Sequence, residues 1–379
     1  MNTTQAILRE EDYCEKAVLY MALELSHKTW RLVFSAGGKE RQVSIEARSL
    51  VRLGEEIRKA KVKFGLPEEA GVRSCYEAGR DGFWLHRYLL SSGIENVVLE
   101  SASIEIDRRA RRAKTDRLDG GKLVKQLMRH HRNGEFLRVV RVPSVEHEDE
   151  RRLHRELERL KKERTGHRNR LQSLVVTQGV VLKPGRDFLQ RLAGIVLWNG
   201  EPLPVDLKAE LEREYGRLRL VEEQIQGLEA ERLKRLEGCE RPELKQVLAL
   251  ARLRGLGSGS AWVLVMEFFG WRGFRNRREV GAAAGLVGTP YASGESTREQ
   301  GSSQAGNRRV RALIIELAWA WLRYQPSSAL SRWFAERFGP GGKRSRRVGI
   351  VALARRLLVA LWRYHEFGEV PAGAELKPV

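Results

Sequence analysis

Two aspartates that could hold a divalent metal ion stand in segment 114–119, Lys-Thr-Asp-Arg-Leu-Asp. Asp116 and Asp119 are three residues apart at the start of a predicted helix, so their carboxylates share one helix face. Two further acids, Glu24 and Glu77, occur in or directly after apolar, β-like runs. Four carboxylates near strand ends and a helix start repel one another, and their pKa values would rise unless a cation neutralises them. Oxygen-only ligation of this kind suits Mg²⁺ or Mn²⁺.

The net charge indicates what such a metal site would act on. The 379 residues include 69 Lys+Arg against 49 Asp+Glu, a formal net charge of +20, and most of the excess lies in residues 241–379. A charge of this sign and size is typical of proteins whose partner carries phosphates. The acids together with the basic chain therefore predict metal-assisted phosphodiester chemistry.

Other classes of protein fit the composition less well. A polybasic membrane-surface protein would need an amphipathic anchor or a lipidation motif, and neither is found. No apolar run reaches the roughly 18 residues that span a bilayer, and the N-terminus does not resemble a signal peptide. Cys14, Cys75 and Cys239 are far apart and lack metal-site spacing, which predicts a reduced, cytoplasmic protein.

Residues 15–143 are predicted to form an α/β domain. Three β-like runs come first, and helices and strands then alternate. The predicted strands are 17–25, 30–35, 41–45, 72–77, 96–100 and 136–140, and the predicted helices are 48–64, 83–90 and one starting at Asp116. This is the order of ribonuclease-H-like folds, in which acids on the first strand, a middle strand end and a late helix meet at one point.

Residues 144–238 are highly charged and carry a narrow leucine seam. Leu157 and Leu218 are typical members, since apolar residues recur at steps of three and four on both halves of the segment. Such a stripe predicts an antiparallel helical pair or a dimerising coiled coil. A solvated helical linker is the alternative.

Residues 239–379 are predicted to be mainly helical. Gly255 and Gly257 lie between two apolar helical runs, in a segment that resembles a helix–hairpin–helix. Backbone N–H groups at such a turn can cradle a phosphate, although a plain helix–helix turn fits equally well. The whole chain is thus predicted to be α/β plus all-α.

Segment 285–303 is rich in serine and glycine and precedes three arginines, Arg308, Arg309 and Arg311. The ordinary interpretation is a flexible loop. The functional alternative makes one serine a nucleophile on a phosphate, with the arginines stabilising negative charge. The Trp and Leu residues that follow are most simply core.

Three stretches of the chain resemble transposases of the insertion-sequence 110 family, 1111 subgroup, which are related to the Piv DNA invertase. These stretches are 75–85, 111–119 and the Tyr-Ala-Ser-Gly of 291–294, and the resemblance runs in order from about residue 18 to 360. It implies an N-terminal RuvC-like domain, with the ribonuclease H fold, that carries an Asp-Glu-Asp-Asp quartet for divalent metal. The quartet falls on Glu24, Glu77, Asp116 and Asp119, and Glu24 departs from the usual Asp by one methylene.

The resemblance also implies roles in the C-terminal part. The family's serine falls on Ser293, which would attack a DNA phosphodiester near the acidic site of another protomer. Family members are guided by a structured noncoding RNA that pairs with target and donor DNA. The residues expected to contact nucleic acid are Arg111, Arg112, Lys114, Gly255, Gly257, Arg298, Arg308, Arg309 and Arg311.

The sequence therefore predicts a metal-dependent, RNA-guided transposase that cuts and rejoins DNA through a serine–DNA intermediate. Its expected partners are donor and target DNA, the guide RNA and further copies of itself in a homodimer or tetramer, with no membrane, in a prokaryotic cytoplasm at the nucleoid. A RuvC-like junction resolvase would need the quartet but not the serine. An inactive nucleic-acid-binding relic would keep neither activity.

Overall fold

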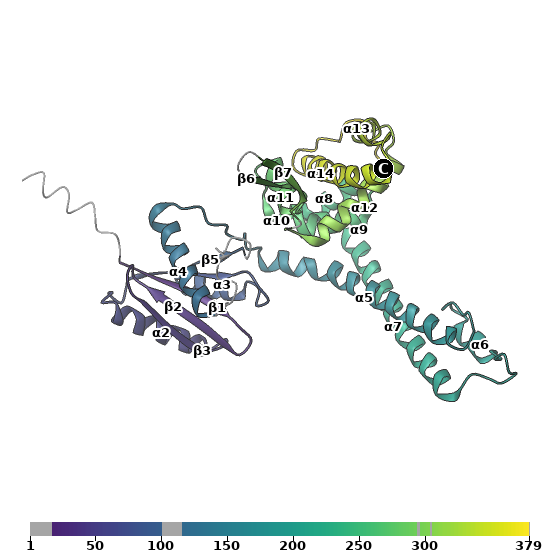
Figure 1. Ribbon diagram of the computed structural model, residues 1–379, viewed down its shortest axis with the longest axis horizontal. Helices are drawn as coiled ribbons and strands as arrows, with labels where there is room; N and C mark the ends of the chain where they lie inside the picture. The colour runs from purple at the N-terminus through teal and green to yellow at the C-terminus, as the bar shows by residue number, and fades with distance from the viewer. Residues whose placement is uncertain (1–16, 101–115, 294–295, 304, 379) are drawn as a thin grey trace, which may run out of the picture. The chain divides into compact units, whose positions relative to one another are not determined.

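The computed structural model describes residues 17–100, 116–293, 296–303 and 305–378, with the side chains of 116–119 and 289–300 outside that description. The chain divides into two compact units, one ending at Val142 and the other beginning at Pro143. Each unit has its own hydrophobic core. Figure 1 labels the elements of both units.

A five-stranded mixed sheet forms the centre of the first unit. Its strands are β1 (Val18–Leu25), β2 (Thr29–Ser35), β3 (Glu40–Glu46), β4 (Gly71–Glu77) and β5 (Glu95–Leu99), in the order β3-β2-β1-β4-β5. β1, β2 and β3 pair antiparallel, whereas β4 and β5 run parallel to β1. The central strand β1 is buried from Leu19 to Leu23 because helices cover both faces of the sheet.

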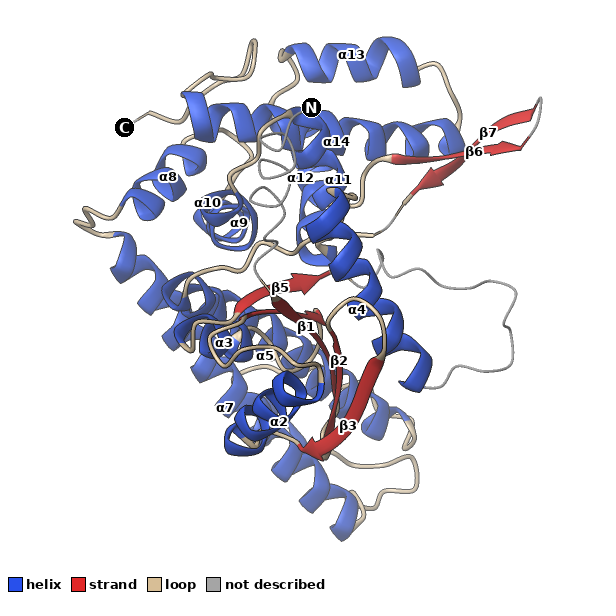
Figure 2. Ribbon diagram, turned by 90° about the vertical axis from the view of Figure 1, so that its left-hand side faces the viewer, coloured by secondary structure: helices blue, strands red, loops and turns tan. Residues whose placement is uncertain are grey.

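The two faces of this sheet carry different helices (Figure 2). α2 (Leu50–Lys63) and α3 (Trp84–Ser91) pack on one face, where Leu53 and Leu85 join a core with Met21. α4 (Asp116–Asn133) packs on the other face, where Leu123 and Val124 meet alternate strand residues. Successive strand residues point to opposite faces of the sheet, so each face presents its own set of apolar side chains to the helices that cover it.

The predicted α/β elements of this unit are confirmed, with one exception. The run 136–140 was expected to be a strand, but among the described residues it forms only an isolated bridge, Leu99 to Val139. Phe136 is 87% exposed, so the run has no second buried side that would hold it in the sheet. None of its side chains is fully buried, although Glu100 N donates to Arg138 O at 3.0 Å and Val140 N donates to Val98 O at 2.7 Å.

A long helical hairpin opens the second unit. α5 (Val145–Val176) and α7 (Val205–Leu236) pair, and the segment between them contains the short helix α6 (Phe188–Ala193). Leu157 and Leu160 of α5 pack with Val221 and Ile225 of α7, while Leu171 packs with Leu218. Early α5 thus meets late α7, so the two helices are antiparallel.

This pairing decides between the interpretations of the leucine seam. The seam joins two helices of one chain, and Leu157 and Leu218 are 3% and 1% exposed within it. The antiparallel helical pair is therefore confirmed, and the solvated linker is wrong. A dimer built on these leucines would compete with their burial inside the chain, so the seam is no longer an argument for self-association.

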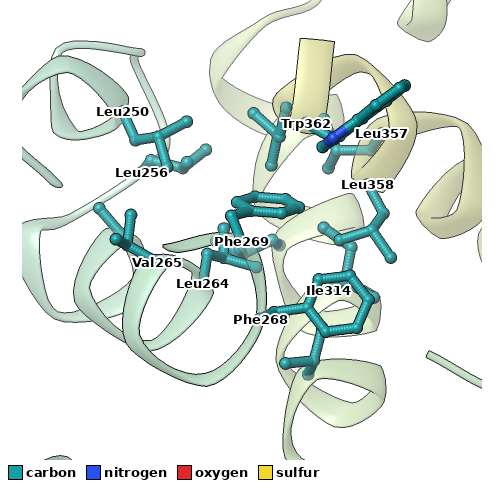
Figure 3. Close-up of a cluster of buried hydrophobic side chains, with 14 of the residues drawn as sticks. Leu250, Leu256, Leu264, Val265, Phe268, Phe269, Ile314, Leu357, Leu358 and Trp362 are labelled. Carbon is teal, nitrogen blue, oxygen red and sulfur yellow. The ribbon is translucent and has the colours of Figure 1, made fainter. Parts of the chain in front are cut away.

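The rest of the second unit is a helical bundle with one β-hairpin. Its helices are α8 (Pro242–Ala251), α9 (Ser258–Leu264), η3 (Val265–Phe269), α10 (Gly270–Arg272), α11 (Arg277–Ala283), α12 (Arg308–Tyr324), α13 (Ala329–Phe338) and α14 (Lys343–Phe367). Figure 3 shows Phe268 and Phe269 of η3 among Ile314 of α12 and Leu358 of α14. The expectation that the leucines and tryptophans after residue 308 are core holds for Trp321, although Trp319 is 44% exposed.

The segment interpreted as a flexible serine–glycine loop is instead a β-hairpin. β6 (Gly288–Ser293) pairs antiparallel with β7 (Ser296–Ser302), and Ser293 pairs with Ser296 at its end. Composition alone indicated a loop because clusters of serine and glycine between periodic segments are typical of loops. The backbone pairing of the two arms overrides that preference.

The burial of the seam gives a testable expectation. Leu218→Ala should lower the free energy of unfolding by about 2–5 kcal/mol, because the lost side chain is fully buried and leaves a cavity. Leu220→Ala on the same helix is the control, since Leu220 is 56% exposed and its loss should cost no more than about 0.5 kcal/mol. Urea unfolding followed by circular dichroism measures both, and equal effects would place the seam outside the hairpin core.

Candidate functional site

Glu24 and Glu77 come to the same edge of the sheet. β1 and β4 are parallel neighbours, and their register pairs Leu23 with Tyr76. Glu24 and Glu77 are the next residue of each strand, so they occupy corresponding positions at adjacent strand ends. Parallel strands place their carboxyl ends together, and this brings the two predicted metal ligands to one place.

Both glutamates occupy positions on the α4 face of the sheet. Tyr20, Ala22 and Cys75 belong to the core beneath α4. Glu24 and Glu77 follow Ala22 and Cys75 by two residues, and alternate residues of a strand share a face. The pair thus shares the side of the sheet on which Asp116 and Asp119 begin their helix.

A glycine contact places the Glu24 carboxylate next to the first turns of α4. A Cβ added to Gly120 would lie 3.2 Å from Glu24 Oε1 and 2.7 Å from Val33 Cγ2. Gly120 directly follows Asp119, so the carboxylate and the segment carrying both aspartates are close together. The side chains of Asp116 and Asp119 lie outside the described residues, and their part in the quartet stays a prediction.

The exposure of the two glutamates differs. Both carboxylate oxygens of Glu24 are buried, whereas Glu77 is exposed at the end of its strand. Beneath them, burial raises the pKa of the Cys75 thiol to about 12, and its Sγ lies 3.8 Å from Leu123 O. This cysteine is a neutral packing residue rather than a nucleophile. Among the described side chains, no group of three acids, histidines or cysteines is close enough to hold a metal.

The second predicted centre is the tip of the β6–β7 hairpin. Ser293 is the last residue of β6, at the end of the hairpin. Its side chain, like that of Arg298, is not described, so its role as nucleophile stays a prediction. Arg111, Arg112 and Lys114 lie entirely outside the described residues.

The arginines at the start of α12 make specific contacts inside the second unit. Arg309 Nε donates to Glu158 Oε2 of α5 at 2.6 Å. Arg311 donates to Gly285 O and, at 2.7 Å, to Ser302 Oγ of β7. Burial would raise the pKa of the Glu158 carboxyl, but hydrogen bonds from Lys162 and Arg309 hold it below its usual range. Arg309 and Arg311 therefore orient α12 against α5 and the β-hairpin, whatever contacts they make with nucleic acid.

The turn with Gly255 and Gly257 is also held by the protein itself. Gly255 has φ +88°, and a Cβ there would lie 3.2 Å from Tyr324 Cβ of α12. Lys377 Nζ donates to Leu256 O at 2.6 Å, and Arg254 N donates to Glu375 O at 3.1 Å. Gly255 is thus required by a left-handed backbone and close packing. A phosphate cradle at this turn remains a prediction.

The buried carboxylate of Glu267, which the sequence patterns did not identify, connects α5, η3 and the start of α12. Glu267 is 1% exposed and lies in the π-helix η3. His154 Nε2 lies 2.8 Å from its Oε1, and Arg155 donates to both oxygens at 2.6 and 3.0 Å. Asn307 Nδ2 donates to Oε2 at 3.4 Å, while Asn307 Oδ1 caps the first turn of α12. An acid within the apolar run Val-Met-Glu-Phe-Phe was the available sequence signal.

These contacts determine the ionisation of Glu267. Burial alone would raise the pKa of its carboxyl, but the hydrogen bonds from His154 and Arg155 outweigh burial and hold the pKa well below its usual range. A carboxylate that is charged at neutral pH in a buried position stabilises the fold only while its partners remain. It fastens α5 to η3 and to the start of α12.

The protein is thus a basic chain of two units. In the first unit, Glu24 and Glu77 lie at the carboxyl ends of adjacent parallel strands of a mixed sheet. The chain belongs to the IS116/IS110/IS902 family of transposases. That family's model matches residues 247–332, which include η3, the β6–β7 hairpin and α12. At the level of the family, the resemblance noted in the sequence is thereby confirmed, and membership implies DNA transposition or recombination.

Two relatives show how far the similarity extends. The chain is 42% identical over 381 residues to a Sinorhizobium fredii protein named as transposase y4rJ, covering 95% of this chain and 94% of the relative. It is 27% identical over 214 residues to the transposase for insertion sequence element IS1328 of Yersinia enterocolitica, covering 55% and 60% of the two chains. Across the described residues, no helix is both long and apolar enough to cross a membrane.

The Glu267 network predicts a pH-dependent stability difference. Glu267→Gln should lower the free energy of unfolding at pH 7 by about 3–5 kcal/mol, because it leaves the buried His154 and the partly exposed Arg155 without their charged partner. The folded-state pKa is depressed, so the stability that the carboxylate supplies is present above about pH 5 and is lost as pH falls toward the folded pKa. The gap between wild type and variant should therefore narrow in acid.

Thermal or urea unfolding between pH 3 and pH 8 measures that gap. Glu316→Gln on α12 is the matched control, since Glu316 is exposed and its loss should change little at any pH. A gap for Glu267→Gln that stays constant down to pH 3 would contradict the depressed pKa.

Proposed function

We propose that this transposase cuts and rejoins DNA using the four carboxylates of its first unit and Ser293 of its second. The observation that carries the proposal is the placement of Glu24 and Glu77 at corresponding positions on parallel strands, beside the segment that begins α4. The parallel pairing of β1 and β4 brings these two residues to one edge of the sheet. The metal, the serine intermediate and the guide RNA belong to the same proposal.

The first unit is proposed to be a RuvC-like domain with a ribonuclease H fold. Three antiparallel strands followed by two strands parallel to the first support this assignment. The position of α4 also supports it, because α4 covers the face of the sheet to which Glu24 and Glu77 belong by strand alternation. The proposed domains are 15–143, 144–238 and 239–379; the division at Val142 supports the first boundary and the extent of the α5–α7 hairpin supports the second.

The residues fit a divalent cation in their chemistry. Carboxylates from two strand ends and one helix start form an all-oxygen donor set, which hard cations prefer. Glu24, Glu77, Asp116 and Asp119 would hold the ion. When bound, Mg²⁺ or Mn²⁺ would neutralise these acids and polarise a scissile phosphate. The buried oxygens of Glu24 would keep one side of the site closed to water, while the exposed Glu77 would leave the opposite side open to DNA.

Ser293 is proposed to be the nucleophile. Its oxygen would form a bond to the phosphorus while the bond from phosphorus to the 3′-oxygen breaks, and the serine proton would pass to that oxygen. The reverse step, with a new 3′-hydroxyl as the attacking group, would rejoin the strand. The position of Ser293 at the end of a hairpin supports access to a large substrate, and Arg311 of α12 anchors the other arm through Ser302.

A structured noncoding RNA and an assembly of two or four chains complete the proposal. The net charge of +20 supports binding to a large phosphate-bearing partner. The resemblance to the insertion-sequence 110 family supports the guide RNA and the pairing of Ser293 with the acids of another protomer. A junction resolvase would use the same acids with water as nucleophile, and it would form no covalent bond to DNA.

A covalent adduct tests the recombinase. Wild-type protein incubated with DNA and Mg²⁺, then denatured, should contain protein joined to a DNA end through a serine phosphodiester. Ser293→Ala should eliminate the adduct because the attacking oxygen is gone. Asp116→Asn and Asp119→Asn should also eliminate it, because each removes a charged metal ligand while keeping side-chain shape. Denaturing gel electrophoresis of labelled DNA measures the adduct.

Matched variants guard against unspecific loss. Ser296→Ala and Ser303→Ala should keep the adduct. Glu95→Gln should keep it as well, because Glu95 lies at the start of β5, at the edge of the sheet opposite to Glu24 and Glu77, and pairs with Arg73 at 3.0 Å. Free DNA ends without an adduct, from both wild type and Ser293→Ala, would favour the resolvase. Near-normal cleavage by both aspartate variants would disprove the quartet.

The guide RNA is tested by digestion. Binding should fall steeply with salt because phosphate contacts release counterions, and RNA should bind at least as well as duplex DNA. Ribonuclease treatment of the purified complex should abolish recombination, and adding back the co-purified RNA should restore it. Recombination at full rate after digestion would remove the RNA from the proposal.

A further inference from the structure

A cavity of about 350 Å³ lies on the helical hairpin. α5 contributes Arg164 and Arg168, α7 contributes residues from Tyr215 to Glu229, and the connecting segment contributes 184–186. Figure 1 shows α5 and α7 side by side, with α6 in the segment that joins them. None of the residues proposed to hold metal or attack DNA lines this cavity.

The lining is dominated by arginine. Four arginines face two glutamates, and both glutamates already have cationic partners. Glu222 is paired with Arg168 at 2.7 Å and with Arg219 at 3.4 Å. Glu229 is paired with Lys161 at 2.7 Å. The carboxylates thus cannot neutralise the whole set.

Two of the four arginines remain available. Within the part of the chain that the structure describes, no hydrogen bond or ion pair within 4 Å engages the guanidinium groups of Arg164 and Arg186. The pKa of the Glu229 carboxyl is lowered chiefly by its hydrogen bond from Lys161, and the charge of Arg164 contributes a smaller part. Both arginines line the cavity, one from α5 and one from the connecting segment. A guanidinium group binds phosphate oxygens through two parallel N–H donors, so two of them can hold one phosphate from two directions.

Contacts within the protein hold the connecting segment that lines the cavity. The Tyr215 hydroxyl donates to Gly185 O at 2.8 Å, which ties the connecting segment to α7. The ring of Tyr215 stacks on Phe188 of α6 with centroids 4.8 Å apart. A loop held in this way does not have to be ordered when an anion binds, and the cost of binding is correspondingly lower.

The size of the cavity limits the occupant. Pockets for small ligands have volumes of about 300–1,000 Å³, which admits one nucleotide unit but not a duplex. The Gln226 side chain on its rim is exposed and can both donate to and accept from a base edge. A single-stranded segment can offer an unpaired nucleotide in this way, whereas a duplex keeps its bases stacked.

We propose that this hairpin cavity binds a nucleotide of a single-stranded nucleic acid, with its phosphate between Arg164 and Arg186. The inference rests on the proposed handling of nucleic acid but not on the cleavage chemistry. In the sequence, the α5–α7 hairpin connects the first unit to the helical bundle, and the proposal adds a binding role to this connection. A free nucleotide or inorganic phosphate would offer the same phosphate group to Arg164 and Arg186, so the experiment must distinguish these ligands from a nucleic-acid strand.

The test compares two double variants of the full chain. Arg164→Gln/Arg186→Gln removes the available pair, and Arg152→Gln/Arg213→Gln removes the same charge from exposed positions of α5 and α7 outside the cavity. Fluorescence anisotropy measures binding to a labelled 20-nucleotide single strand, as RNA and as DNA, at several salt concentrations. The melting temperatures of both variants verify folding.

We expect the cavity variant to bind about 10–100-fold more weakly, and its slope of log K against log[salt] to fall by about 0.7 for each phosphate that the variant no longer neutralises. The control variant should change affinity by less than about threefold. A photoreactive 5-iodouridine strand should cross-link to the wild-type peptide containing Tyr215 or Gln226. Equal reductions of affinity in both variants, or cross-links only elsewhere, would overturn the proposal.

Two further arms complete the design. Adenosine monophosphate and inorganic phosphate are added as competitors, and displacement of the strand only at millimolar concentrations supports a nucleic-acid site. Thermal stabilisation by micromolar mononucleotide, abolished in the cavity variant while strand affinity is unchanged, would overturn it. Ser293→Ala should bind the strand as wild type does, so a failed adduct experiment and a failed cavity experiment remain distinct.

Discussion

The second unit depends on keeping a charged carboxylate in its interior. Glu267 is buried, and its oxygens accept hydrogen bonds from α5 and from the residue that caps α12. A buried charge is costly unless it is fully paired, so these three elements can separate only at the expense of exposing it or leaving it unpaired. Arg309 and Arg311 then extend the same set of contacts from α12 to Glu158 and to β7. The helical hairpin, the serine-bearing β-hairpin and the arginine-rich helix are therefore one mechanically connected body.

Much of the first unit could be predicted because its patterns are local. Val18–Leu25 is almost wholly apolar, as a strand covered on both faces must be, and Leu53, Ile57 and Ala60 repeat at helical spacing. The convergence of Glu24 and Glu77 followed from strand order, and the register agrees with it. The run 136–140 was misread because β-like composition does not show whether a partner strand is present along its length. Only one bridge forms there among the described residues.

Contacts between distant segments could not be predicted, since nothing local specifies them. Leucine periodicity showed that α5 and α7 have apolar stripes but not that each is the other's partner within the chain. Serine and glycine hid a β-hairpin whose arms are joined by backbone pairing. Glu267 stood as a lone acid in an apolar run, and only folding brings residues more than 100 positions away to it. The roles of Arg309 and Arg311 inside the protein were hidden for the same reason.

The close approach of Gly120 to the sheet has a consequence for how this domain can vary. Helix α4 comes so near to β1 and β2 that residue 120 has room for a hydrogen atom but not a methyl group, with Val33 and the Glu24 carboxylate as the obstacles. The side chains at positions 24, 33 and 120 thus compete for the same space. With alanine at position 120, the Val33 side chain would have to shift or be smaller, and the Glu24 carboxylate would have to move by a few tenths of an ångström. Positions 24, 33 and 120 are therefore sterically coupled, and a substitution at one of them is expected to require changes at the others.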